Sequence, residues 1–95
     1  MKIMKRLQTL EETIPLMLSE DPEDRFIAEY SQLMLRIESL CRHIQQLEST
    51  PTTIPDPRIE QMDTQLSNML SYLTSLTVRS VNEGIILPFD RNREE

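Results

Sequence analysis

The stretch "DPEDRFIAEYSQLMLRIESLCRHIQQLE", Asp21 to Glu48, decides the fold of this chain. Its apolar residues are separated by alternating steps of four and three, which is the spacing of heptad positions a and d. These residues are Phe26, Tyr30, Leu33, Ile37, Leu40, Ile44 and Leu47. Asp21 suits an N-cap and Pro22 the first helical position. The stretch predicts one long helix whose apolar stripe needs a partner.

A second stretch, Asp56 to Gly84, supplies that partner because it repeats the same pattern. It begins with another Asp-Pro pair, its core positions follow the same spacing, and Gly84 suits a left-handed C-cap. Those core positions are Ile59, Met62, Leu66, Met69, Leu73 and Leu76. Between the two stretches, "STPTTIPD" contains two prolines that cannot continue a helix. Two nearly equal helices joined by a short linker predict an antiparallel hairpin.

The expected organisation is a single all-α domain over residues 1–95. We expect an N-terminal helical arm over residues 1–20, with its helix near residues 2–13, because Ile3, Leu7, Leu10 and Ile14 have helical spacing. The hairpin covers residues 21–84 with a linker at 49–56, and a tail covers 85–95. In the register that we expect for the two paired helices, Leu47 stacks on Ile59 and Leu33 stacks on Leu73. Apolar residues of the tail, from Ile85 to Phe89, either fold back on the hairpin or dock on a neighbouring subunit.

One flank of the predicted hairpin is apolar and the hairpin alone leaves it in water. Ile27, Met34 and Cys41 form this strip on the first helix, with Leu70 on the second. The arm or another subunit must cover it. We therefore expect a homo-oligomer, either a dimer or a multiple of dimers with closed symmetry.

The opposite flank is polar and carries the candidate ligand-binding residues. Glu29, Arg36 and His43 of the first helix face Arg79, Tyr72 and Gln65 of the second, with Tyr30 beside them. A purely structural interpretation is an ion pair between Glu29 and Arg79 and a cation–π contact of Arg36 with Tyr72. In a binding site, the two guanidinium groups would contact phosphates while a tyrosine stacks on a base.

Composition excludes several classes of function. A net charge of −6 argues against binding to a DNA or RNA polymer. The single Cys41 fits a reducing cytoplasm, and the apolar runs are too short to span a membrane. The chain offers no triad, phosphate-binding glycine loop or metal-ligand cluster, and His43 has no second ligand at a suitable spacing. We expect no enzyme activity, no metal and no cofactor.

The hairpin resembles a family of short helical-hairpin proteins from crAss-like and other tailed phages. The likeness covers roughly residues 24–87 and rests on two segments, "RFIAEYSQLMLRIESL" from Arg25 and "QLSNMLSYLTSLTVRSVNEGI" from Gln65. The chain is also similar, in size and architecture, to the phage hairpin proteins of the anti-CBASS and anti-Thoeris type. Those proteins assemble as homo-oligomers and sequester cyclic nucleotide or cyclic ADP-ribose immune signals between subunits.

Two functions follow and the sequence leaves both open. The resemblance implies a phage anti-defence protein that sequesters a cyclic oligonucleotide or cyclic ADP-ribose signal without cleaving it. The alternative is a non-enzymatic interaction or structural module that binds a host or virion protein through its apolar flank and tail.

Overall fold

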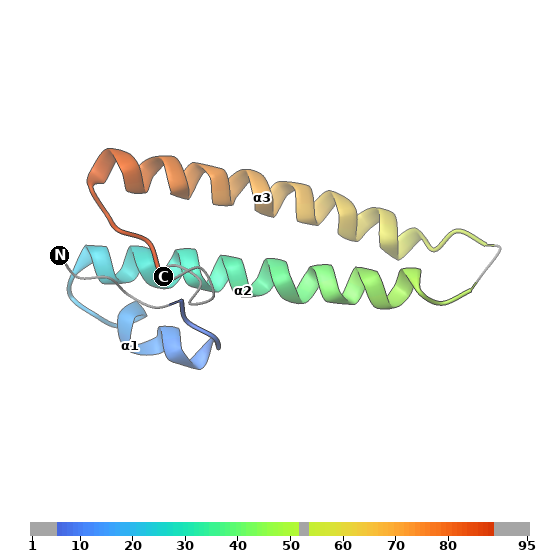
Figure 1. Cartoon of the computed structure of the whole chain (residues 1–95), viewed down its shortest axis with the longest axis horizontal. Helices are drawn as coiled ribbons and strands as arrows, with labels where there is room; N and C mark the ends of the chain where they lie inside the picture. Colours follow the sequence, from blue (N-terminus) through green and yellow to red (C-terminus); the bar gives the residue numbers. More distant parts are fainter. Residues whose placement is uncertain (1–5, 52–53, 89–95) are drawn as a thin grey trace, which may run out of the picture.

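The chain folds into a long helical hairpin with a short arm packed on one side of it (Figure 1). The computed structural model describes residues 6–51 and 54–88. In chain order the elements are a 3₁₀ helix η1 (Glu11–Thr13), α1 (Ile14–Met17), α2 (Pro22–Glu48) and α3 (Pro57–Glu83). No strand occurs among the described residues. The prediction of an all-helical chain with two packed long helices is confirmed.

Both long helices begin and end at the residues that the sequence indicates. Each has 27 residues, which gives a length of roughly 40 Å at 1.5 Å per residue. Asp21 caps α2 by accepting the backbone N–H of Glu23, at 3.0 Å from Oδ1. Gly84 ends α3 in the left-handed conformation with φ 70°, which a side chain would strain.

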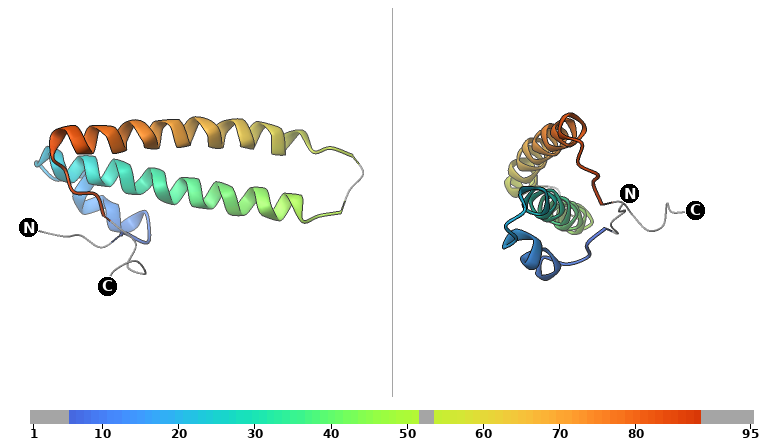
Figure 2. Two further views of the ribbon diagram at one scale, coloured as in Figure 1. Left: turned by 45° about the horizontal axis from the view of Figure 1, so that its top comes forward. Right: turned by 90° about the vertical axis from the view of Figure 1, so that its left-hand side faces the viewer.

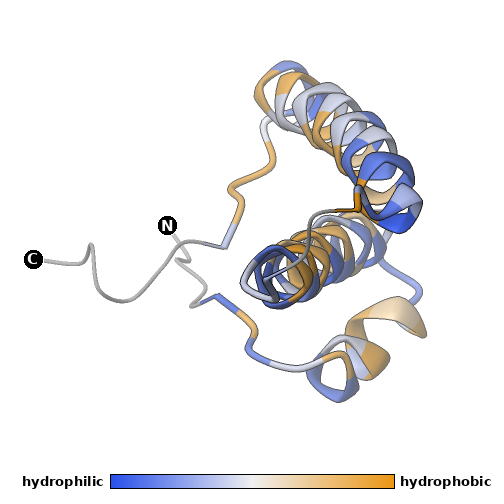
Figure 3. Cartoon of the chain, turned by 90° about the vertical axis from the view of Figure 1, so that its right-hand side faces the viewer, coloured by the Kyte–Doolittle hydropathy of each residue, from blue (hydrophilic) through white to orange (hydrophobic). Residues whose placement is uncertain are grey.

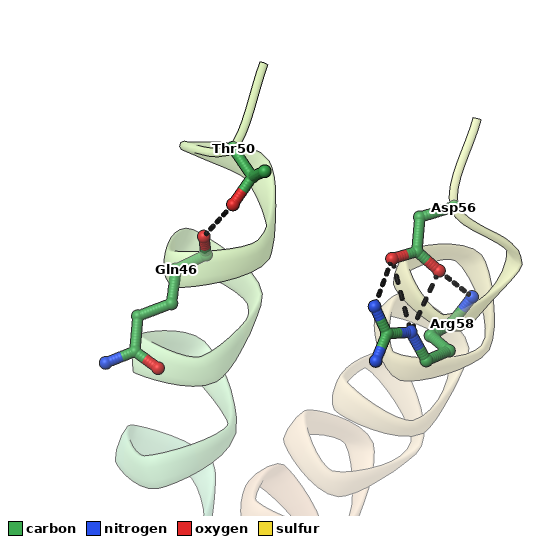
Figure 4. Close-up of polar contacts among 4 residues, drawn as sticks. All are labelled: Gln46, Thr50, Asp56 and Arg58. Atoms are coloured by element: carbon green, nitrogen blue, oxygen red, sulfur yellow. Dashed lines mark hydrogen bonds and ion pairs between the residues drawn. The ribbon is translucent and has the colours of Figure 1, made fainter. Parts of the chain in front are cut away.

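At the linker side of the hairpin, each of the two helix ends has its own local polar contacts (Figure 4). Asp56 Oδ1 accepts the backbone N–H of Arg58 at 2.9 Å, and the Arg58 guanidinium reaches the other carboxylate oxygen at 2.7 Å. At the end of α2, the Thr50 hydroxyl lies 3.5 Å from the carbonyl oxygen of Gln46. The Asp56 carboxylate therefore both caps α3 and neutralises an arginine.

The core is the seam between α2 and α3. Its central cluster consists of Phe26, Leu33, Ile37 and Leu76, all buried, with half-buried core residues of both helices around it. Leu47 and Ile59 line one hollow beside the linker, as the register requires. On α3 only Leu76 and Ser80 are buried among the described residues, so the outer face of this helix stays open to water.

The arm and α3 lie on opposite sides of α2 (Figure 3). The arm, residues 6–18, packs against α2 through α1 and η1. Of the apolar strip on α2, Ile27 is buried, whereas Met34 and Cys41 are half-buried. Part of this strip is therefore covered within the chain, while Leu70 on α3 stays 46% exposed.

The arm helix differs from the sequence prediction. Residues 6–10 have no helical structure, and the helix runs from Glu11 to Met17 instead of near residues 2–13; residues 1–5 lie outside the described part. The reason is a capping box, in which Thr9 accepts the Glu12 N–H while Glu12 accepts the Thr9 N–H. Pro15 then fits the first turn of α1.

The tail folds back on its own hairpin. Residues 85–88, the strap, leave the end of α3 and run back toward α2 (Figure 2). Ile85 and Leu87 pack against the core cluster, and Pro88 is buried. Of the two predicted alternatives, this part of the tail therefore follows the first, in which it folds back on the hairpin. Phe89 lies outside the described residues.

Leu76 should carry much of the stability of the seam. Its side chain is 2% exposed, so Leu76→Ala leaves a cavity and lowers the free energy of unfolding by about 2–5 kcal/mol. Leu18 on the arm is 74% exposed, and Leu18→Ala should change the free energy of unfolding by no more than about 0.5 kcal/mol. Urea unfolding measures both, and equal effects would contradict the placement of Leu76 in the core.

Asp56 should make stability depend on acidic pH. Its hydrogen bonds to the side chain and backbone of Arg58 lower the pKa of the carboxyl below 3.8. A lowered folded-state pKa means that the stabilisation is complete above the unfolded-state pKa and disappears as the pH falls through the folded one. The melting-temperature difference between wild type and Asp56→Asn should therefore shrink as the pH is lowered from 5 toward 2. A difference that does not change with pH would contradict this role.

Candidate functional site

A groove of about 560 Å³ lies where the arm, α2 and α3 meet. Its floor is formed by half-buried apolar side chains, Leu35 and Leu40 from α2 and Met69 from α3. Its rim is polar, with contributions from all three segments. The rim residues are Gln8 and Thr9 of the arm, Arg36, Ser39, Arg42 and His43 of α2, and Gln65 of α3, with Leu10 beside them.

The described lining of the groove is positively charged, in an acidic protein. Among the described residues that line it there is no Asp or Glu, although the chain has 16 of them. Arg36 and Arg42 make no hydrogen bond or ion pair with any residue that the structure describes. Two exposed guanidinium groups without a carboxylate form a site where an anion can bind.

The other described arginines already have partners. Arg6 pairs with Glu38, Arg58 with Asp56 and Arg79 with Glu83, while Arg25 donates to the carbonyl oxygen of Ser19 at 2.7 Å. The two arginines that face the groove are thus distinguished from the rest by having no protein acceptor among the described residues.

The structure brings three of the predicted ligand-binding residues together. Arg36, His43 and Gln65 all line the groove, and all three are exposed. They come from facing positions of the two long helices, as the hairpin register requires. The polar flank therefore lines part of the groove at this end.

The other four candidates lie outside the groove. Tyr72 is 44% exposed and lies three residues beyond Met69 on α3, one turn from the groove floor. Tyr30 is half-buried and packs against the core cluster. Arg79 and Glu29 lie toward the other end of the hairpin. The assignment of these four residues to a ligand site stays a prediction.

Arg79 has a different set of neighbours from the one that the sequence suggests. Its guanidinium lies over the ring of Phe26, 4.8 Å from the centroid. Its Nε donates to Glu83 at 3.0 Å; this hydrogen bond is the main cause that raises the pKa of Arg79, and the charge of Glu29 adds to it at longer range. Arg79 therefore forms its ion pair with Glu83, one turn along α3, whereas the structural interpretation named Glu29. The cation–π contact joins Arg79 and Phe26, whereas the structural interpretation named Arg36 and Tyr72.

Sequence reasoning missed Arg42 and the contribution of the arm. Arg42 precedes His43 and lies six residues after Arg36, so the heptad assignment placed it outside the flank. The available signal was the series Arg36, Ser39 and His43, which marks a polar face that Arg42 borders. Nothing in the spacing of residues 6–10 indicates that they reach this face.

A comparison with protein families bears on what such a groove does. A family model described as Sequestin matches residues 20–82, well over half of the chain. The chain belongs to the Sequestin family. No curated protein and no solved structure matches it. The match covers the α2 and α3 sides of the groove, whereas the arm residues Gln8, Thr9 and Leu10 lie outside it.

The family name, Sequestin, indicates the binding and sequestration of a ligand rather than catalysis. In the described part of the chain, no helix is long and apolar enough to cross a membrane. The same residues include no group of three or more His, Cys, Asp or Glu that could hold a metal ion. The resemblance to hairpin proteins of tailed phages stays a prediction.

Proposed function

We propose that this member of the Sequestin family is a phage anti-defence protein that sequesters a small cyclic nucleotide immune signal without cleaving it. The ligand is a cyclic oligonucleotide or a cyclic ADP-ribose, and the site is the groove between the arm, α2 and α3. The observation that carries the proposal is the pair Arg36 and Arg42. Among the described residues, they have no protein acceptor and share the groove lining with no Asp or Glu.

The chemistry of the groove suits both parts of a nucleotide. Two guanidinium groups at the rim can bind phosphate oxygens through charge-assisted hydrogen bonds. The floor of Leu35, Leu40 and Met69 offers apolar contact to a base, and His43 and Gln65 supply hydrogen-bonding groups at its edge. We propose that Tyr72, which lies one turn beyond the floor, stacks on a base that extends out of the groove.

Sequestration without cleavage agrees with the chemistry of the site. Phosphodiester hydrolysis needs a positioned base or a metal-bound water in addition to phosphate contacts. The described residues that line the groove offer His43 as a base but no carboxylate to orient it. We therefore propose that the ligand leaves the protein in the form in which it arrived.

The proposal predicts a charge-dependent loss of affinity in two variants. Arg36→Ala and Arg42→Ala should each weaken binding about tenfold or more, because each removes a charged hydrogen bond. Arg58→Ala, which removes the same charge beside the linker, is the matched control and should bind like the wild type. Calorimetry against cyclic dinucleotides, cyclic trinucleotides and cyclic ADP-ribose isomers measures the affinities.

Two further measurements sharpen this test. Ligand released by heat denaturation should have an unchanged mass, since a linear product would show hydrolysis. Arg79→Ala tests the other predicted half of the polar flank: retained affinity assigns Arg79 to a structural role, and lost affinity extends the site along α3. If no member of the panel binds the wild type, sequestration of these signals is wrong.

We also propose that the chain associates with itself. After the arm and strap have packed, large apolar side chains still face solvent on α3 and on the arm. They include Leu70, Val78 and Val81 on α3 and Leu18 on the arm, with exposures of 46%, 53%, 76% and 74%. A homodimer, or a multiple of dimers, would bury the α3 stripe by closed symmetry.

Light scattering after size-exclusion chromatography tests this association. The wild type should elute at twice 11.2 kDa or an even multiple of it. Val78→Glu should give a monomer with the same helix content, while Leu18→Glu, an equally drastic change on the arm, should keep the oligomer. A monomeric wild type at micromolar concentration would contradict the proposal.

The alternative function is a protein-interaction module. The exposed apolar stripe on α3 favours it, because such a surface also suits a host or virion protein. Under this alternative the wild type binds no signal in the panel, and the Arg36 and Arg42 variants behave like the wild type in every assay.

A further inference from the structure

One wall of the groove comes from a segment with no regular structure of its own. Gln8, Thr9 and Leu10 line the groove, are exposed and precede the first helical turn of the arm. A loop of this kind would ordinarily sample many positions, which would widen and narrow the groove. Its placement must therefore be fixed by contacts elsewhere.

Local hydrogen bonds first fix the loop relative to the arm helix. Glu12 accepts the backbone N–H groups of both Gln8 and Thr9, the latter at 3.0 Å. Thr9 Oγ1 in turn accepts the Glu12 N–H at 3.2 Å. These reciprocal bonds make residues 8–12 one unit, so that the position of the wall depends on where this unit sits on α2.

Thr13 fixes that unit to α2. Its side chain is 0% exposed, and its hydroxyl makes two hydrogen bonds at once. It donates to the carbonyl oxygen of Leu10 at 2.6 Å and accepts from Nε2 of Gln32 at 3.0 Å. A threonine hydroxyl has one proton to donate, and Thr13 donates it to Leu10, which is part of the arm wall of the groove.

The residue of α2 that makes this contact, Gln32, lies on the same helix as the two arginines of the groove. Gln32 lies four residues, about one helical turn, before Arg36. The same helix therefore holds Gln32, which anchors the arm, and the guanidinium groups that face it across the groove. The bond between Thr13 and Gln32 ties one wall to the other after the wall residues in the chain, and the pair of Arg6 with Glu38 ties the arm to α2 before them.

We infer that Thr13 is a positioning residue of the ligand site, acting through Leu10 and Gln32 to hold the arm wall opposite Arg36 and Arg42. This inference rests on the proposed function, because it assigns Thr13 to the site in which the signal binds. Thr13 touches no ligand in this role. Its effect on affinity comes from preorganisation of the groove.

The experiment compares Thr13→Val with Thr13→Ser. Valine keeps the shape of threonine but removes both hydrogen bonds, whereas serine keeps the hydroxyl. Titration calorimetry uses those cyclic nucleotides or cyclic ADP-ribose isomers that the wild type binds, well below the melting temperature of each variant. Thr13→Val should weaken binding about tenfold, and Thr13→Ser should stay within about twofold of the wild type.

Two readouts separate positioning from general destabilisation. Amide hydrogen exchange at residues 9–13 should accelerate in Thr13→Val, with no acceleration at the hairpin core around Leu76. Gln32→Leu removes the same bond from the α2 side and should weaken binding to a similar extent. This second variant tests the inference if the valine variant does not fold.

The outcomes of this experiment are distinct. Wild-type affinity in both Thr13→Val and Gln32→Leu, with or without faster exchange in the arm, overturns the positioning role and leaves the proposed function intact. Weaker binding in Thr13→Ser equal to that in Thr13→Val also overturns it, because the hydroxyl would then not matter. If the wild type binds no probe, the proposed function fails and this inference with it.

Discussion

The apolar seam between α2 and α3 is the interaction on which the rest of the structure depends. Two helices can cover each other along one stripe only, so the seam leaves a flank on either side of the hairpin. The arm packs on one side of α2, and the strap packs against the core cluster through Ile85 and Leu87. Where the arm approaches the polar flank, the groove forms. The position of the candidate site is thus a consequence of how a short chain completes the burial of its seam.

Most of the fold follows from sequence because local and long-range signals agree. The Asp-Pro pairs at Asp21 and Asp56 start the two helices, Gly84 ends the second, and the heptad spacing gives the seam. The arm was placed wrongly because the spacing of Leu7, Leu10 and Ile14 resembles a helix, whereas the capping box at Thr9 and Glu12 starts it later. The capping box therefore decided where the arm helix begins, and the apolar spacing did not.

The site was predictable only in part, for a related physical reason. Register alone brings Arg36, His43 and Gln65 to one flank, and all three line the groove. It gives no information about residues that reach the flank from elsewhere, such as Gln8 and Thr9, or about long side chains at the border of a face, such as Arg42. The sequence also did not predict the partners of Arg79, which are Glu83 in its own helix and the Phe26 ring. The ion pair of Arg79 thus formed within one turn of its own helix, and its contact with α2 is to an aromatic ring instead of to Glu29.

The proposed function depends on Arg36 and Arg42 as anion-binding groups of a groove whose described lining contains no Asp or Glu. The most direct measurement is an NMR titration that follows the Nε–H signals of the arginine side chains as cyclic dinucleotide or cyclic ADP-ribose is added. The signals of Arg36 and Arg42 should shift with saturation, while those of Arg25 and Arg58 stay in place. A saturating shift confined to Arg79, or confined to Arg25 and Arg58, with Arg36 and Arg42 unmoved, would contradict this role.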